Sequence, residues 1–151
     1  EPREDLGNFL HVEKKRIHRN IRMGYLDAFK AMGKLEGKDY YFRNFYSESE
    51  ALQRLANLNF ETKNRINRLL FDKDLVNERF FFEKTIYKIA RMLKLDVNAG
   101  YMTIMLHVYE TLLKHLEVDI YEVYSPVIAN HRISDLELDR DLEIYQLLLG
   151  L

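Results

Sequence analysis

The segment from Tyr101 to Ile120 carries two apolar stripes at helical spacing, and this pattern restricts the fold more than any other feature of the chain. A helix that is apolar on two sides must bury both of them. One stripe can face the core of its own chain, and the other then needs a partner. We therefore expect a homodimer, with a central helix inside a monomer as the alternative. The stripes are Tyr101, Ile104, Met105, Val108, Leu112 and His115, and Met102, Leu106, Tyr109, Leu113, Leu116 and Ile120.

The rest of the chain also favours helix. It has 151 residues with only 2 prolines and 6 glycines, which predicts one all-α domain over residues 1–151. Ser47 and Glu50 have the spacing of a capping box, and the glycines of 33–39 break the first helix. The expected helices run from about 10 to 32, 48 to 70 in one or two pieces, 75 to 93, 96 or 98 to 124, and 133 to 149.

Composition bears on the partners and the location of the protein. The chain has no cysteine, a net charge of −1, no visible signal peptide and no apolar run long enough to span a membrane. We expect a cytoplasmic protein without nucleic-acid partners, because the net charge gives no electrostatic reason to bind nucleic acid or an anionic membrane. The basic run 14–22 is interpreted as a solvated helix face, with an anion or acidic-partner site as the alternative.

Motifs for catalysis or metal binding are absent from the sequence. There is no glycine-rich phosphate loop, HExxH or GxSxG, and the scattered carboxylates suggest no acid–base pair. None of the histidine pairs has the i,i+4 spacing of a helical metal site. We therefore predict no metal and no enzyme activity. The histidines are His11, His18, His107, His115 and His131.

Part of the chain resembles the globin-coupled sensors. "KIARMLKLDVNAGYMTIM" (88–105) is similar to the R-I-A/G-x-x-H-x-R-I-G-L run of that family, and "LELDRDLEIY" (136–145) is similar to the pattern of its last helix. "RINRLLFDKDLVNERF" (65–80) resembles its heme-linked helix. The resemblance covers about 65–149 and implies a globin-like fold that dimerises through its last two helices.

The same resemblance implies that heme is lost. The heme-ligating histidine of the family would fall at Ile66 or Leu69, and neither side chain can bind iron. The family includes non-heme sensor domains of sporulation histidine kinases and stand-alone homologues. These are thought to bind a fatty acid and a halide ion in the heme region and to inhibit sporulation by competing for the kinase's signal or partner.

By this resemblance the protein is a non-catalytic regulator that binds a small amphipathic ligand, a fatty acid with chloride, and acts on a sensor histidine kinase. A heme gas sensor with an atypical ligand and a ligand-free dimerisation or scaffold module are the alternatives. A buried carboxylate needs a cationic partner, for which Arg54, Lys63 and Arg65 are the candidates. The predicted cavity is lined by Tyr25, Phe29, Leu55, Leu58, Ile66, Leu69, Ile89, Met92, Tyr101 and Met105. The predicted dimer interface contains Leu106, Tyr109, Leu113, Leu116, Ile120, Leu142 and Tyr145.

Overall fold

The structure, a computed structural model, describes residues 14–134 and 139–151 and is mostly helical. Its contacts divide the chain into two compact units. Of the described residues, unit 1 comprises 14–45 and 118–126, and unit 2 comprises 46–117, 127–134 and 139–151. Within the described ranges, none of the helices has the length and apolar character that crossing a membrane requires.

Unit 1 is built on α1 (Lys14–Ala31) and a parallel pair of short strands, β1 (Tyr41–Phe42) and β2 (Val123–Tyr124). Gly33 and Gly37 take positive φ angles after α1, at the predicted break of the first helix. One face of α1 packs on the turn and strands that follow, through the buried Leu26, Leu35 and Tyr41 and the half-buried Phe29 and Val123. The Tyr41 hydroxyl donates to the Asp27 carboxylate at 2.6 Å.

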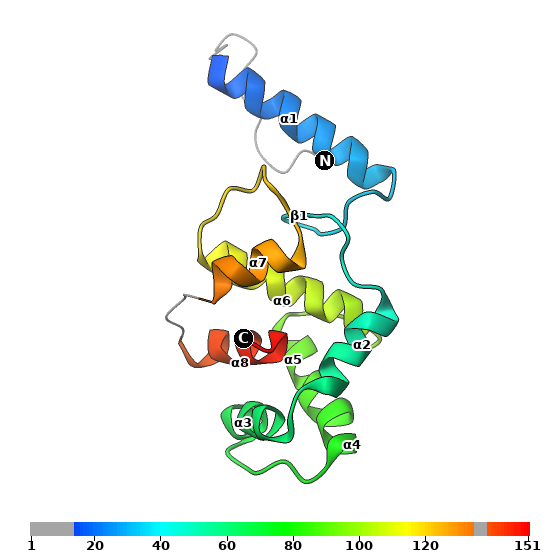
Figure 1. Ribbon diagram of the computed structural model, residues 1–151, viewed down its shortest axis with the longest axis vertical. Coiled ribbons are helices and arrows are strands. Elements are labelled where there is room, and N and C mark those ends of the chain that lie inside the picture. The colour runs from blue at the N-terminus through cyan, green and yellow to red at the C-terminus, as the bar shows by residue number, and fades with distance from the viewer. Residues whose placement is uncertain (1–13, 135–138) are drawn as a thin grey trace. The chain divides into compact units, whose positions relative to one another are not determined.

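Unit 2 is a helical assembly in which α6 lies against α2 and α8 (Figure 1). A π-helical turn separates α4 from α5, where the sequence predicts one helix over 75–93. The other predicted helix over 48–70 is divided in two at 58–59. The elements are α2 (Glu48–Asn57), α3 (Phe60–Phe71), α4 (Glu78–Phe80), the π-helix η1 (Phe81–Thr85), α5 (Ile86–Met92), α6 (Tyr101–His115), α7 (Pro126–Ile133) and α8 (Arg140–Leu149). Pro126, the first residue of α7, belongs to unit 1 by its contacts.

The beginning of α2 confirms a prediction from the sequence. The Ser47 hydroxyl accepts from the backbone N–H of Glu50, and the Glu50 carboxylate accepts from the backbone N–H of Ser47 at 2.7 Å. This is the predicted capping box, which satisfies two backbone donors at the start of the helix.

The beginning of α6 differs from the prediction. The helix starts after Gly100, not at Asp96 or Asn98. Its first N–H groups are capped from a distant part of the sequence, because the Glu48 carboxylate accepts from Tyr101 and Met102 at 2.6 and 3.0 Å. A Cβ atom on Gly100 would lie 2.7 Å from that carboxylate, so a larger residue there would disturb the cap.

The predicted end of this helix and the predicted last helix also need correction. α6 ends at His115 rather than near 124, and Glu117 takes a φ of 51° directly after it. The last helix, expected over 133–149, begins only at Arg140, where the Asp139 carboxylate caps α8. The helix α7 before it, which Pro126 opens, was not predicted.

Both stripes of α6 are buried within the single chain. From the first stripe Ile104, Met105, Val108 and Leu112 are at most 3% exposed, and from the second Leu106, Tyr109 and Leu113 are at most 8% exposed. Between residues 106 and 113, the second stripe therefore offers no exposed face for another copy. The argument that led from two stripes to a homodimer is wrong, although the homodimer itself stays a prediction.

Candidate functional site

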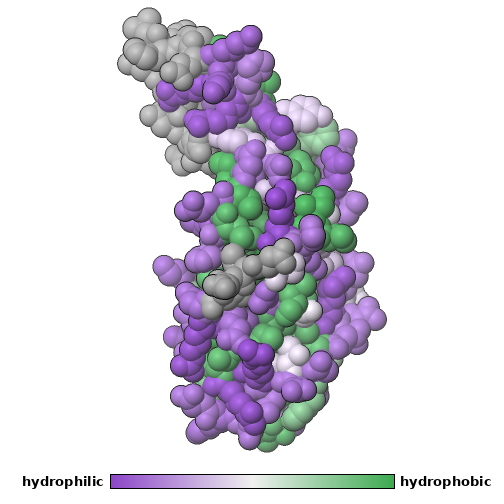
Figure 2. Space-filling view, turned by 60° about the vertical axis from the view of Figure 1, so that its left-hand side comes forward, coloured by the Kyte–Doolittle hydropathy of each residue, from purple (hydrophilic) through white to green (hydrophobic). Residues whose placement is uncertain are grey.

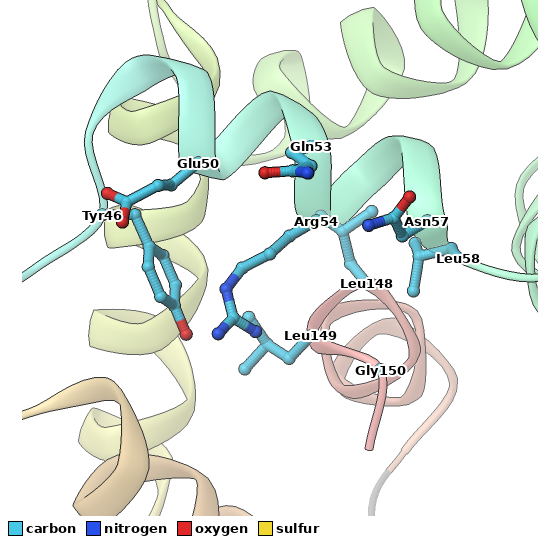
Figure 3. Close-up of a pocket in the computed structure, with 9 residues that line it drawn as sticks. All are labelled: Tyr46, Glu50, Gln53, Arg54, Asn57, Leu58, Leu148, Leu149 and Gly150. Atoms are coloured by element: carbon cyan, nitrogen blue, oxygen red, sulfur yellow. The ribbon is translucent and has the colours of Figure 1, made fainter.

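A pocket of about 600 Å³ lies between α2 and the end of α8, within unit 2 (Figure 3). Its floor is apolar and comes from Leu58, Leu148 and Leu149. Its polar wall is a row of α2 side chains that begins beside Tyr46 and ends at Asn57. The lining residues are Tyr46, Glu50, Gln53, Arg54, Asn57, Leu58, Leu148, Leu149 and Gly150.

Arg54 is the cationic group of this pocket. Its guanidinium carbon lies 4.2 Å from the centre of the Tyr46 ring, and Figure 3 shows the guanidinium between Tyr46 and Leu149. Stacking on an aromatic face leaves the N–H groups at the edge of the guanidinium plane available to an anion. Among the residues that the structure describes, the Arg54 side chain forms no hydrogen bond and no ion pair.

Tyr46 is held in place from the interior of unit 2. Its hydroxyl lies 3.2 Å from the Tyr109 hydroxyl, which donates to the Asn130 side-chain oxygen at 2.7 Å. Burial, followed by the hydrogen bond with Tyr46, raises the pKa of Tyr109 far above its usual range. The Tyr109 phenol therefore stays protonated at neutral pH, and the Tyr46 ring beneath Arg54 is held by a chain of hydrogen bonds.

Glu50 is the acidic residue of the pocket wall, but its carboxylate is already bound. One of its oxygens accepts from the Ser47 backbone N–H at 2.7 Å and from the Ser47 hydroxyl at 2.8 Å. These two hydrogen bonds lower the pKa of Glu50, and the positive charge of Arg54 contributes to the same shift. The capping box thus holds this carboxylate at Ser47, so Arg54 keeps its own hydrogen-bonding capacity.

The other two predicted cations have partners. Lys63 is 1% exposed, and its Nζ lies 2.7 and 3.0 Å from the Glu78 carboxylate oxygens and 2.8 Å from the Ala56 carbonyl oxygen. Arg65 pairs with Glu143 of α8. Because each already binds a carboxylate, Arg54 is the candidate that can bind another.

The ten predicted cavity residues do not gather around one pocket. Leu58 lines the pocket of Arg54, while Tyr25 and Phe29 belong to unit 1. Leu69, Met92 and Tyr101 are half-buried in unit 2 and line neither of the two pockets described here. The fully buried members are Leu55, Ile66, Ile89 and Met105, each at most 1% exposed.

Tyr25 and Phe29 line a second pocket of about 350 Å³ inside unit 1. Its walls are mainly apolar, with two arginines at the rim, and Arg22 donates from Nε to the Tyr121 carbonyl oxygen at 2.8 Å. Sequence reasoning identified the two aromatic residues but neither arginine. The lining residues are Arg22, Tyr25, Leu26, Phe29, Leu35, Arg43 and Val123.

The predicted interface residues lie largely inside the chain. Besides the three from α6, Leu142 and Tyr145 of α8 are 7% and 6% exposed, and Leu116 and Ile120 are half-buried. Leu148, Leu149 and Gly150, which close the Arg54 pocket, were not predicted. They line the pocket because α8 contacts α2, and no local pattern in the sequence predicts that contact.

The histidines form no metal centre in the part of the chain that the structure describes. No group of three or more His, Cys, Asp or Glu side chains could hold an ion there. His107 Nδ1 lies 3.9 Å from a Glu110 carboxylate oxygen, whereas His18, His115 and His131 are exposed and His11 lies outside the described residues.

Comparisons with known proteins assign no family to the chain. No family model matches it, and neither a curated protein nor a solved structure matches it. The resemblance to globin-coupled sensors therefore stays a prediction, and the geometry of the Arg54 pocket carries the functional argument.

Proposed function

We propose that the protein is a non-catalytic regulator whose ligand is a small amphipathic carboxylate of the fatty-acid class. The carboxylate would bind Arg54, and its carbon chain would lie on Leu58, Leu148 and Leu149. The observation that carries the proposal is Arg54 itself, an arginine in a pocket of about 600 Å³ that has no hydrogen bond or ion pair among the described residues.

The chemistry of the pocket supports a carboxylate head group. A guanidinium presents a planar fork of N–H donors that matches the two oxygens of a carboxylate, and such charge-assisted bonds are about twice as strong as neutral ones. The amide groups of Gln53 and Asn57, on the same wall of the pocket, add uncharged donors that an anion can use. Chloride could take the same position, because it also needs a cationic group and N–H donors.

The apolar floor supports a carbon chain of limited length. Each buried methylene contributes about 0.8 kcal/mol, before the cost of ordering the chain. Three leucine side chains can cover only part of a long acyl chain. We therefore expect a short or medium chain and a dissociation constant between about 10 µM and 1 mM, which corresponds to about −7 to −4 kcal/mol.

The regulatory part of the proposal rests on the resemblance to globin-coupled sensors. By that resemblance the protein is a cytoplasmic, homodimeric, heme-less globin-like domain. It would inhibit sporulation by taking a fatty acid from a sensor histidine kinase or by binding the kinase. Ligand binding would act by population shift, and α2 and α8, which both line the pocket, are the elements that it would affect first.

The test is calorimetric titration of the protein with decanoate. The variant Arg54→Gln keeps a polar side chain but removes the charge, and Arg91→Gln removes a charge from another exposed arginine of unit 2. We expect Arg54→Gln to weaken decanoate binding by about tenfold or more, equivalent to about 1.4 kcal/mol. Arg91→Gln should stay within about twofold of the wild type.

Decanol, with the same chain length and no charge, provides the second control. It should bind the wild type and Arg54→Gln equally weakly. Equal decanoate affinity for the wild type and Arg54→Gln, or no binding of decanoate at all, would contradict the proposal and favour a ligand-free scaffold. Native mass spectrometry of the purified protein would reveal a retained ligand, and a Soret band would favour the heme alternative.

A further inference from the structure

Helix α1 carries an apolar stripe that faces outward. Its members recur every three or four residues along the helix and, at about 100° per residue, span an arc of about 80°. Apolar residues on such a stripe normally face a core. Here the large ones are exposed: Ile17 by 41%, Ile21 by 65% and Tyr25 by 60%. Met32, directly after the end of the helix, is 58% exposed.

The stripe is not needed for the core of unit 1. α1 packs through a different face, on which Met23 and Leu26 are each 5% exposed. Gly24 lies beside the stripe, and a Cβ atom added there would meet no other atom within 4 Å. The helix therefore has one apolar face inside unit 1 and a second apolar face, around Ile17 and Ile21, that is largely exposed. Tyr25, at the edge of this second face, also contacts Phe29 and lines the unit 1 pocket.

The charge of α1 is distinctive as well. The helix contains six Lys and Arg residues and one acidic residue, Asp27, so its net charge is +5 in a chain whose net charge is −1. Asp27 accepts a hydrogen bond from Tyr41, so this carboxylate is directed to the unit 1 side of the helix. Hydrophilic residues dominate the part of α1 seen at the top of Figure 2. The net charge of the whole chain is thus near zero although α1 is strongly basic. The net charge of the chain therefore does not predict how α1 interacts with an anionic membrane.

The distribution of the basic residues indicates the kind of partner. Lys14 lies in line with the stripe at its N-terminal end, while Lys15 and Arg19 lie on the side and back of the helix and are exposed. A second α1 would bring two helices of charge +5 together, which disfavours self-association. A protein groove would contact only the residues near the stripe. The electrostatic potential of an anionic bilayer extends about 10 Å at ordinary salt, which is roughly the diameter of a helix. It therefore attracts the basic residues on every side of α1.

We propose that α1 is an interfacial helix that binds the surface of an anionic membrane. Basic amphipathic helices lie in the plane of the bilayer interface with the apolar face buried among the head groups. Ile17, Ile21 and Met32 enter the acyl boundary, and Tyr25 places its ring there with the hydroxyl toward water. The exposed Lys14 and Lys15 side chains extend to the phosphates and each contribute about 1 kcal/mol near an anionic surface. Arg19 and Arg22, which contact Tyr121, add to the positive potential of the helix. This inference is independent of the Arg54 pocket.

The test is co-sedimentation with lipid vesicles. One set contains phosphatidylcholine alone, and in the other about half of the lipid is phosphatidylglycerol, which supplies the negative surface. We expect binding to the anionic vesicles only, weakened by added salt. Ile21→Glu should reduce that binding by about tenfold or more, because it places a carboxylate in the apolar stripe.

Val127→Glu is the matched control. Val127 is 78% exposed on α7, so the variant adds the same charge away from the stripe and should bind within about twofold of the wild type. Circular dichroism would verify that both variants keep their helix content. The proposal is wrong if the wild-type protein does not bind the anionic vesicles, or if Ile21→Glu binds them as strongly as Val127→Glu does. Binding of the stripe to an acidic protein without any affinity for vesicles would also overturn it.

Discussion

Two helices of this protein with similar apolar periodicity have opposite surroundings. α6, in unit 2, buries eight residues over its 15 positions, whereas α1, in unit 1, buries two over 18. α6 has a single acidic residue and one lysine, and it is enclosed by α2 and α8. α1 has six basic residues and keeps three large apolar side chains exposed. Periodicity thus predicts which faces are apolar, while the density of charge distinguishes a helix that its own unit encloses from one that remains exposed.

The largest expected effect comes from truncating the buried stripe of α6. Leu113→Ala should lower the free energy of unfolding by about 2–5 kcal/mol, because it removes a side chain that is 0% exposed and leaves a cavity. Ile21→Ala on the exposed stripe of α1 should change it by less than about 0.5 kcal/mol. Urea denaturation followed by circular dichroism measures both. Similar values for the two variants would break the contrast between the helices.

Next in size is the ion pair of buried Lys63. Glu78→Gln leaves the Lys63 ammonium without its counter-charge and should destabilise unit 2 by about 1–3 kcal/mol. Glu83→Gln is the matched control, since it removes a carboxylate that pairs with exposed Arg79, and it should cost less than about 1 kcal/mol. Denaturant midpoints of the two variants provide the comparison. If both variants behave alike, Lys63 is not a buried cation that depends on Glu78.

Tyr109 makes the stability of unit 2 depend on alkaline pH. Burial raises its pKa in the folded state, while the unfolded chain titrates near pH 10. The stability from the protonated phenol is therefore fully present below about pH 10 and is lost progressively as the pH rises above it. Tyr109→Phe should cost about 1 kcal/mol at pH 7 by removing the bond to Asn130, and should reduce the loss of stability between about pH 10 and 11.5. An unchanged alkaline slope would contradict this assignment.

The smallest effect concerns the wall of the Arg54 pocket. Glu50→Gln preserves the side-chain acceptor of the capping box but removes the negative charge near Arg54. The affinity for decanoate should rise by about two- to threefold, the scale expected when one exposed charge is removed. Calorimetric titration measures the change, with Glu61→Gln on α3 as a control of equal charge. A lower affinity in Glu50→Gln would mean that the bound carboxylate does not lie near Arg54.

Features set by neighbouring residues could be predicted from the sequence. The capping box of Ser47 and Glu50, the glycine break after α1 and the apolar faces of α6 depend on local chemistry, and the structure shows each of them. The beginning and end of α6 could not be predicted, because Glu48 caps its first turn from α2 and Glu117 takes a left-handed conformation just after its end. The apolar periodicity of the sequence predicts neither feature.

The candidate site was predictable only in part, for the same reason. Arg54, Lys63 and Arg65 are three cations on one stretch of the sequence, with nothing local to distinguish them. Lys63 pairs with Glu78, 15 residues farther along the chain, and Arg65 pairs with Glu143, 78 residues farther along. The choice of Arg54 therefore depends on tertiary contacts, as does the leucine floor that α8 provides.

The most direct test of the central claim is an amide NMR titration of the ¹⁵N-labelled protein with decanoate. The account predicts saturable shifts at Arg54, Leu58 and Gly150, the loss of those shifts in Arg54→Gln, and no comparable change at Tyr25 and Phe29. Saturable shifts confined to the unit 1 pocket of Tyr25 and Phe29, unchanged by Arg54→Gln, would contradict it and would transfer the ligand site to unit 1.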